Sequence, residues 1–175
     1  MNDIATQQAK AATPSSAVRV RLAEGEADER VIFDLCVLAM RESKYKDLPL
    51  AADRLRQQIH HDITAKKTNG IILAERLGPD GNPVVLGLLS AIAGRLQFSE
   101  AISCAALIFY VAPEARNSRA ALLLLKAFEK WALNRSAYEI AVHVTMGRED
   151  DARVSVLLER YGFLNPGGGS HFKRL

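Results

Sequence analysis

The chain has 175 residues, 49% of them apolar, with a formal net charge of +3 and a pI of about 9.0. This length suits one domain with its own apolar core and is short for two. The positive excess is small and evenly spread, so it suits an anionic cofactor and does not by itself indicate nucleic acid as a partner. No apolar run approaches the roughly 20 residues that span a bilayer, and residues 1–10 lack the features of a signal peptide. We therefore expect no membrane partner and a cytoplasmic location.

The N-terminal part predicts a leader, a strand and a helix. Residues 1–17 are small and polar and contain Pro14, which predicts a disordered leader before a single domain at residues 18–175. Residues 18–22 alternate between apolar and polar side chains, as a half-exposed strand does. The acidic residues that follow favour the start of a helix that ends near Arg41. Its expected buried stripe consists of Val31, Ile32, Leu35, Leu38 and Ala39.

A polar break at residues 41–49 separates this helix from a second one, in which Leu55, Ile59 and Ile63 recur at four-residue steps. The His-His-Asp run at residues 60–62 could suggest a metal site. Adjacent helical residues point in different directions, and no third histidine or cysteine has matching spacing. A solvated helical face is the better interpretation, and we expect no metal.

The middle of the chain predicts three strands. Two apolar segments, residues 70–75 and 84–91, enclose a stretch of turn-forming residues at 78–83, which predicts an antiparallel hairpin. A second connection, residues 94–102, leads into an apolar run at residues 104–112. We expect this run to be a strand that is buried on both faces.

A polar loop follows this strand after Pro113 and leads into a helix expected at residues 122–132. The first amides of such a helix have no intrahelical acceptors, and they point beyond the strand together with the positive end of the helix dipole. An anion would fit there, and Arg116 and Arg119 flank the position. The alternative is a plain strand–loop–helix crossover with surface arginines.

The C-terminal part predicts another strand and a last helix. Residues 138–145 are typical of an interior strand, and a helical crossover joins it to the earlier strand, so the two are expected to be parallel. Asp150 and Asp151 favour the start of the last helix, which Gly162 closes. The tail, residues 163–175, predicts a turn and a strand. Its three consecutive glycines suit a hairpin turn better than a phosphate loop, because no helix follows them.

Two of these segments resemble one protein family. Residues 109–121 resemble the acyl-CoA pyrophosphate-binding motif of the GNAT superfamily of N-acyltransferases, an Arg/Gln-x-x-Gly-x-Gly/Ala loop after a strand that ends in Val-x-Pro. Arg116 takes the first place of the motif and Ala121 the last, whereas Arg119 stands where the family usually has glycine. Glycine there lets phosphate oxygens approach the backbone, so Arg119 must turn aside or add its own charge. Residues 156–163 resemble the family's C-terminal helix with its Gly-Phe ending.

The order of elements along the domain also matches the GNAT fold. The resemblance implies an α/β (α+β) domain with a mixed central sheet of six to seven strands, flanked by about four helices. It also implies an acyl-CoA-dependent N-acyltransferase, in particular an N-acetyltransferase, that transfers the acetyl group of acetyl-CoA directly to a primary amine in a ternary complex. In the family the cofactor lies between two parallel strands that splay apart, and here these are the strands that end at Val111 and Val144. The residues expected to bind acetyl-CoA are Phe109, Val111, Arg116, Asn117, Ser118, Arg119, Ala120 and Ala121.

The resemblance leaves the acid–base chemistry open. The family often has a tyrosine four residues before the glycine of Gly-Phe, but Leu158 stands there and cannot donate a proton. The catalytic candidates are therefore Tyr110, beside the expected thioester, and His143 in the last predicted strand. Cys104, like Cys36, is better interpreted as a buried core thiol than as a nucleophile that forms an acyl-enzyme.

The acceptor is expected to be an amine of a small molecule or a protein. In the GNAT fold the connection between the first two helices commonly lies over the acceptor, so Tyr45 is a candidate for acceptor contact, with an ordinary solvated loop as the alternative. Two other functions stay open. One is an acyl-CoA-binding module without catalysis, for which Arg119 and Leu158 argue; the other is an RNA-associated protein that acylates charged tRNA, as some GNAT toxins do. The apolar C-terminal strand region could also pair across a homodimer.

Overall fold

The computed structural model describes residues 17–165, 167 and 173. The leader predicted at residues 1–17 lies outside this part of the chain except for its last residue, and so does most of the predicted tail. None of the helices in the described residues combines the length and the apolar composition that a membrane span requires.

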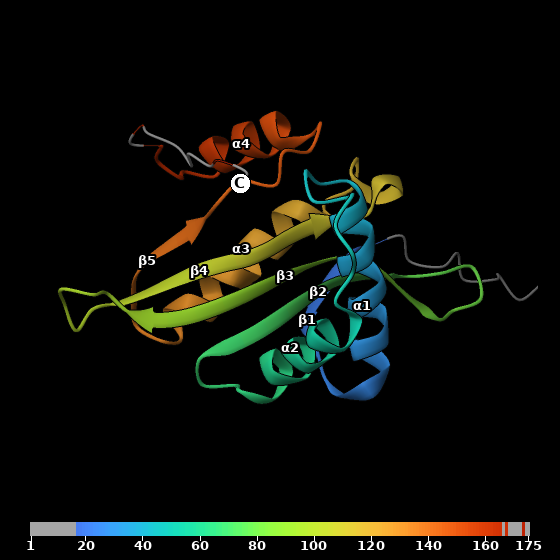
Figure 1. Cartoon of the computed structure of the whole chain (residues 1–175), viewed down its shortest axis with the longest axis horizontal. Coiled ribbons are helices and arrows are strands. Elements are labelled where there is room, and N and C mark those ends of the chain that lie inside the picture. The colour runs from blue at the N-terminus through green and yellow to red at the C-terminus, as the bar shows by residue number, and fades with distance from the viewer. Residues whose placement is uncertain (1–16, 166, 168–172, 174–175) are drawn as a thin grey trace, which may run out of the picture.

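One mixed sheet forms the centre of the fold (Figure 1). Its strands are β1 (Arg19–Leu22), β2 (Asn69–Leu77), β3 (Pro83–Arg95), β4 (Ile102–Val111) and β5 (Ala137–Val142). They lie in sequence order across the sheet, and every neighbouring pair is antiparallel except β4–β5, which is parallel. The predicted hairpin and the predicted parallel crossover are therefore confirmed.

The number of strands differs from the expectation of six to seven, because the described residues form five. A further strand was expected in the tail. Residues 163–165 follow the last helix without strand structure, and the other tail residues lie outside the described part of the chain except for 167 and 173.

In the part of the chain that the structure describes, four α-helices accompany the sheet, in agreement with the expectation of about four. They are α1 (Gly25–Arg41), α2 (Ala52–Thr64), α3 (Ala120–Leu133) and α4 (Asp151–Arg160), and a short 3₁₀ turn, η1 (Pro113–Ala115), precedes α3. The helices α1 and α2 cover one face of the sheet, whereas α3 covers the other, and α4 lies beyond the β5 edge (Figure 1).

The alternation of side chains along the strands builds a separate core on each face of the sheet. In β2, Ile71 and Leu73 pack against α1 and α2, whereas Ile72 and Ala74 pack on the side of α3. The α3 core contains Leu124, Leu125, Phe128 and Trp131, and the α1–α2 core contains Ile32, Leu35, Ile59 and Ile63. Both faces of the central strands are thus covered, and this packing holds the ends of these strands in place.

Candidate active site

The strands β4 and β5 separate partway along their length. Their pairing begins at Ile102 and ends where Ala106 faces Val142, although β4 continues to Val111. At the same point β4 carries a bulge, because Ser90 of β3 pairs with Ile108 and Ala91 pairs with Ala106, which leaves Leu107 without a partner. The chain after β5 therefore leaves the sheet while β4 runs on, and a space opens between them.

Two corrections to the sequence-based expectations follow from this separation. The strand expected at residues 138–145 ends at Val142, so His143 and Val144 lie beyond it. The strand β4 is not buried on both faces, because Leu107 is 54% exposed at the bulge. The apolar pattern of residues 104–112 predicts neither the bulge nor the loss of pairing between β4 and β5.

The space between β4 and the segment after β5, which we call the strand cavity, has a volume of about 340 Å³. Tyr110 of β4 and His143 both line it, so the two catalytic candidates meet at one cavity. Its lining consists of Ala39, Ala106, Leu107, Ile108, Phe109, Tyr110, Val142, His143, Val144, Thr145, Met146, Arg148, Asp151 and Val154.

A second cavity of about 240 Å³, which we call the loop cavity, lies between the β4–α3 loop and α4. Five of the eight expected cofactor-binding residues line it, namely Phe109, Val111, Arg116, Ser118 and Ala121. Phe109, Arg148 and Val154 line both cavities, so the two spaces adjoin along β4.

The start of α3 borders the loop cavity. The amide of Leu123 donates to the carbonyl of Arg119 at 3.0 Å, and the amide of Ala120 donates to Oγ of Ser118 at 3.1 Å. The amides of Ala121 and Leu122 have no acceptor among the described residues. Because both residues line the loop cavity, unpaired donors and the positive end of the helix dipole border that cavity.

The remaining expected cofactor contacts are not brought to the loop cavity. Asn117 and Arg119 are exposed and line neither cavity, and Ala120 is fully buried in the α3 core. The described arrangement therefore gives Arg119 no contact with either cavity.

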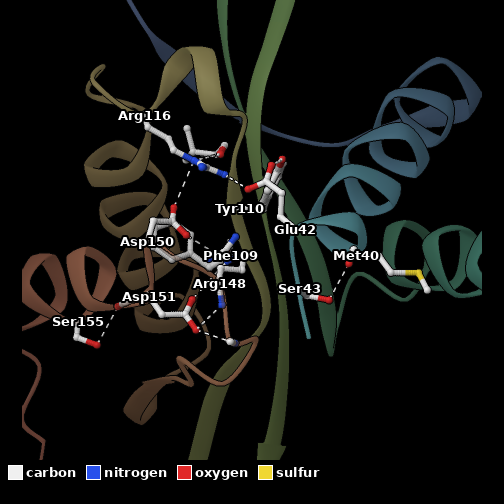
Figure 2. A network of polar contacts seen from close by, with 12 residues as sticks. Met40, Glu42, Ser43, Phe109, Tyr110, Arg116, Arg148, Asp150, Asp151 and Ser155 are labelled. Carbon is white, nitrogen blue, oxygen red and sulfur yellow. Dashed lines mark hydrogen bonds and ion pairs between the residues drawn. The ribbon is translucent and has the colours of Figure 1, made fainter. Parts of the chain in front are cut away.

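A network of polar contacts crosses the site and joins α1, β4 and the segment before α4 (Figure 2). Glu42, the residue after α1, accepts a hydrogen bond from the hydroxyl of Tyr110 at 2.6 Å and forms an ion pair with Arg116. The Nε atom of Arg116 also lies 3.3 Å from Oδ2 of Asp150 and donates to the carbonyl of Val111 at 3.2 Å. The guanidinium of Arg116 is therefore shared between two carboxylates at the edge of the loop cavity.

Arg148 lies between the two cavities, with only 8% of its side chain exposed. Its Nε atom is 3.5 Å from Oδ1 of Asp150 and 3.4 Å from Oδ1 of Asp151, and its guanidinium lies 5.6 Å from the centre of the Tyr110 ring. Oδ1 of Asp150 is buried and has no hydrogen-bond partner among the described residues. The contacts of the Arg148 side chain with carboxylates are thus long, although that side chain is almost completely enclosed.

The surroundings of Tyr110 and Glu42 set their protonation states. Burial, followed by the hydrogen bond to Glu42 and the charge of that carboxylate, raises the pKa of Tyr110 well above its ordinary value. Burial opposes ionisation of Glu42, but hydrogen bonds from Tyr110 and Arg116 outweigh it and lower the pKa of Glu42. At neutral pH the pair therefore consists of a neutral phenol and an ionised carboxylate.

Tyr45 lies apart from both cavities. Its side chain is 42% exposed in the connection between α1 and α2 and lines neither space. That connection nevertheless touches the segment after β5, because the amide of Lys44 donates to the carbonyl of Met146 at 2.9 Å. The loop expected to lie over an acceptor thus contacts Met146, which lines the strand cavity, while Tyr45 itself lines neither cavity.

Other residues considered from the sequence belong to the cores or the surface. Leu158 and Cys104 are buried in the α3 core. Asp62 is buried and accepts hydrogen bonds from the side-chain amides of Asn69 and Gln58, whereas His60 contacts Glu29 at the surface. The described residues contain no group of three or more side chains that could hold a metal ion.

Sequence reasoning missed Glu42, Arg148 and Asp150 as site residues. Glu42 and Arg116 are 74 positions apart, and each of the three follows or precedes a helix in an unremarkable polar segment. Only the folded arrangement brings them together.

No protein-family model matches the sequence, and no curated protein matches it. Solved structures do match. An aminoglycoside acetyltransferase, AAC(6')-Iy in complex with a bisubstrate analogue, is 15% identical, with a TM-score of 0.68 over 91% of this chain and 99% of that one. The ribosomal-protein-alanine N-acetyltransferase of Brucella melitensis biovar Abortus 2308 is 16% identical, with a TM-score of 0.64 over 91% of this chain and 99% of that one.

A third match is an aminoglycoside acetyltransferase from an uncultured soil metagenomic sample in complex with sisomicin, which is 12% identical, with a TM-score of 0.66 over 90% of this chain and 95% of that one. At such identities the likeness concerns the fold and not the substrate. The chain has the fold of the GNAT acetyltransferases.

Proposed function

We propose that this protein is an acyl-CoA-dependent N-acetyltransferase that transfers an acetyl group from acetyl-CoA to a primary amine. The observation that carries the proposal is the pair of adjoining cavities along β4, one of which ends at the unpaired amides of α3. The shared fold supports it, because matching structures are acetyltransferases, one of them solved with CoA.

The loop cavity suits the diphosphate of the cofactor. The amides of Ala121 and Leu122 offer donors at a helix start, where anions are favoured. Arg116 and Arg153 also line this cavity and add positive charge. The backbone of β4 from Phe109 to Val111 would hold the remaining, extended part of the cofactor toward the strand cavity.

When bound, acetyl-CoA supplies an acyl thioester that an amine can attack. No cysteine lines either cavity in the described residues, so the chain offers no thiol for an acyl-enzyme and direct transfer is favoured. His143 and Asp151 line the strand cavity and can accept a proton there, whereas Tyr110, a neutral phenol in the same cavity, can hydrogen-bond to the amine. Backbone amides of β4 next to the bulge are suited to stabilise negative charge on a carbonyl oxygen.

The acceptor would enter from the strand cavity, beneath the connection that carries Tyr45. The matching structures bind or act on amines of very different size, an aminoglycoside in one case and a ribosomal protein in another. A small-molecule amine and a protein amine are therefore both candidates for this chain.

The substitution Ala121→Glu tests the proposal. It places a carboxylate and added bulk against the unpaired amides of α3, so the affinity for CoA, measured by isothermal titration calorimetry, should fall by at least roughly tenfold. Ala121→Ser is the neutral control at the same position and should bind CoA nearly as the parent protein does. Equal affinity in the Ala121→Glu variant, or no binding to the parent protein at millimolar CoA, would contradict the proposed function.

A turnover assay separates catalysis from binding alone. Acetyl-CoA is supplied with a panel of amines, and the release of free CoA thiol is followed. The proposal expects release that depends on at least one amine. Tight CoA binding without turnover on any amine would instead indicate an acyl-CoA-binding module.

A further inference from the structure

Glu42 contacts one lining residue of each cavity and so connects the two linings. It lines neither cavity itself, whereas Tyr110 lines the strand cavity and Arg116 lines the loop cavity. One carboxylate oxygen, Oε1, accepts the hydroxyl of Tyr110, and the other, Oε2, pairs with Arg116. A single carboxylate thus joins Tyr110, a catalytic candidate, to Arg116, a residue expected to bind the cofactor.

The contact with Glu42 determines what Tyr110 can offer in the strand cavity. A tyrosine hydroxyl has one proton, and here that proton is donated to Glu42 at 2.6 Å. The hydroxyl oxygen retains its capacity to accept a hydrogen bond. The other charged groups facing the Tyr110 ring are Arg116 at 5.9 Å and Arg148 at 5.6 Å from its centre, and neither competes for the hydroxyl proton because guanidinium groups only donate.

The ion pair with Glu42 engages the guanidinium of Arg116 inside the protein. Its contacts with Glu42, Asp150 and the carbonyl of Val111 point into the protein and not at the amides of α3. The side chain is 23% exposed and lines the loop cavity, so an anion there would compete with Glu42 for it.

We propose that Glu42 is a positioning residue of this site: it holds the Tyr110 hydroxyl as a hydrogen-bond acceptor toward the strand cavity, and it competes with an anionic ligand in the loop cavity for Arg116. This inference rests on the proposed function for the identity of that ligand, CoA. Binding of CoA then shifts Arg116 from Glu42 toward phosphate. Occupancy of the loop cavity thereby changes the contacts of Glu42, which is the hydrogen-bond partner of Tyr110 in the strand cavity.

The first test concerns Tyr110 and needs no ligand. A hydroxyl proton that is buried and donated to a carboxylate gives a downfield, slowly exchanging proton resonance, which the variant Tyr110→Phe identifies by its loss. In Glu42→Gln this resonance should move upfield and exchange faster, because a neutral amide oxygen is the weaker acceptor. Glu114→Gln removes a negative charge from an exposed side chain of the η1 turn that forms no hydrogen bond or ion pair with Glu42, Tyr110 or Arg116 in the described part of the chain, and it should leave the resonance unchanged.

The second test concerns Arg116 and uses CoA as the probe. Glu42→Gln should increase the affinity for CoA by about fivefold in calorimetric titration, because it removes the competitor for Arg116. The same substitution in an Arg116→Gln background should give no increase. A general effect of lost negative charge would persist in that background and would also appear in Glu114→Gln.

The outcomes separate the two proposals. If the parent protein binds CoA and Ala121→Glu does not, but Glu42→Gln leaves both the affinity and the Tyr110 resonance unchanged, the role of Glu42 is refuted and the proposed function stands. If the parent protein binds no CoA, the proposed function fails and the competition for Arg116 fails with it. Should Glu42→Gln not fold, Glu42→Asp keeps the charge but shortens the side chain so that it cannot reach both partners. For the inference to hold, Glu42→Asp must then change either the Tyr110 hydroxyl resonance or the affinity for CoA relative to the parent protein.

Discussion

Gly87 of β3 lies opposite Val111, where β4 ends at the loop cavity. A Cβ atom at Gly87 would lie 2.5 Å from the carbonyl oxygen of Tyr110 and 2.9 Å from Cα of Val111. Both are backbone atoms of a central strand, which cannot turn away as the end of a flexible side chain can. This glycine therefore allows β3 and β4 to approach closely next to Tyr110, which lines the strand cavity, and Val111, which lines the loop cavity.

The substitution Gly87→Ala should lower the free energy of unfolding by about 1–3 kcal/mol, because it forces the two strands apart. Urea denaturation followed by circular dichroism measures the loss. Gly94→Ala is the matched control in the same strand, since a Cβ atom there has no neighbour within 4 Å. It should change the free energy of unfolding by less than about 0.5 kcal/mol, and an equal loss in both variants would contradict the steric argument.

At the scale of single elements, the junction of β1 and α1 shows how a helix start is fixed without its usual cap. The residue before α1, Glu24, makes no side-chain hydrogen bond to the helix. Asp28 serves the junction instead, because its carboxylate accepts the amide of Glu24 at 2.7 Å and two donors of Arg21 at 2.6 and 2.8 Å. The hydrogen bond from Arg21 is the largest cause of a lowered pKa of Asp28, with burial opposing it and the Glu24 amide adding to it.

A lowered pKa in the folded state means that ionised Asp28 stabilises the fold. That contribution is fully present above the pKa of an aspartate in an unfolded chain, about 3.9, and it is lost as the pH falls through the lower pKa of the folded protein. Asp28→Asn should therefore cost about 1–3 kcal/mol of unfolding free energy at pH 7, and the difference from the parent protein should shrink below about pH 4. Denaturation curves across this pH range measure it. Asp53→Asn is the control, because this aspartate in the first turn of α2 is exposed and pairs only with the exposed Arg56 among the described residues; it should show a much smaller difference.

The sequence predicted most elements near this site because their signals are local. An apolar run that ends at Pro113 and a following helical pattern were sufficient to predict β4, the loop and α3 in order. The end of β5 was wrong by three residues, because Val144 and Thr145 are β-branched strand formers that continue the pattern of the strand. What ends β5 is the loss of its partner at the Leu107 bulge, and a bulge depends on pairing that one strand does not reveal.

At the scale of the whole molecule, the site arises where three distant segments meet. Glu42, Arg116 and Asp150 come from the end of α1, the β4–α3 loop and the start of α4. Each residue alone fits a solvated polar segment, so no spacing rule selects it. Their meeting follows from the order of the strands and from α1 and α3 lying on opposite faces of the sheet (Figure 1).

The two cores share one sheet, so we expect them to unfold together. Ile32→Ala in the α1–α2 core should lower the free energy of unfolding by about 2–5 kcal/mol. The single tryptophan, Trp131, lies in the core on the opposite face, and its fluorescence should show the same reduced midpoint as circular dichroism does. A fluorescence midpoint that stays at the parent value while circular dichroism shifts would show that the two faces unfold separately.

The two cysteines have a practical consequence for work on this chain. Cys36 lies in the α1–α2 core and Cys104 in the α3 core, and burial raises the pKa of both thiols, that of Cys36 to about 11. Since a thiol reacts as its thiolate, the native protein should be nearly inert toward disulfide dyes such as Ellman's reagent. In the turnover assay proposed above, any colour would then come from CoA and not from the protein's own thiols, so the protein can be used at high concentration without raising the background signal.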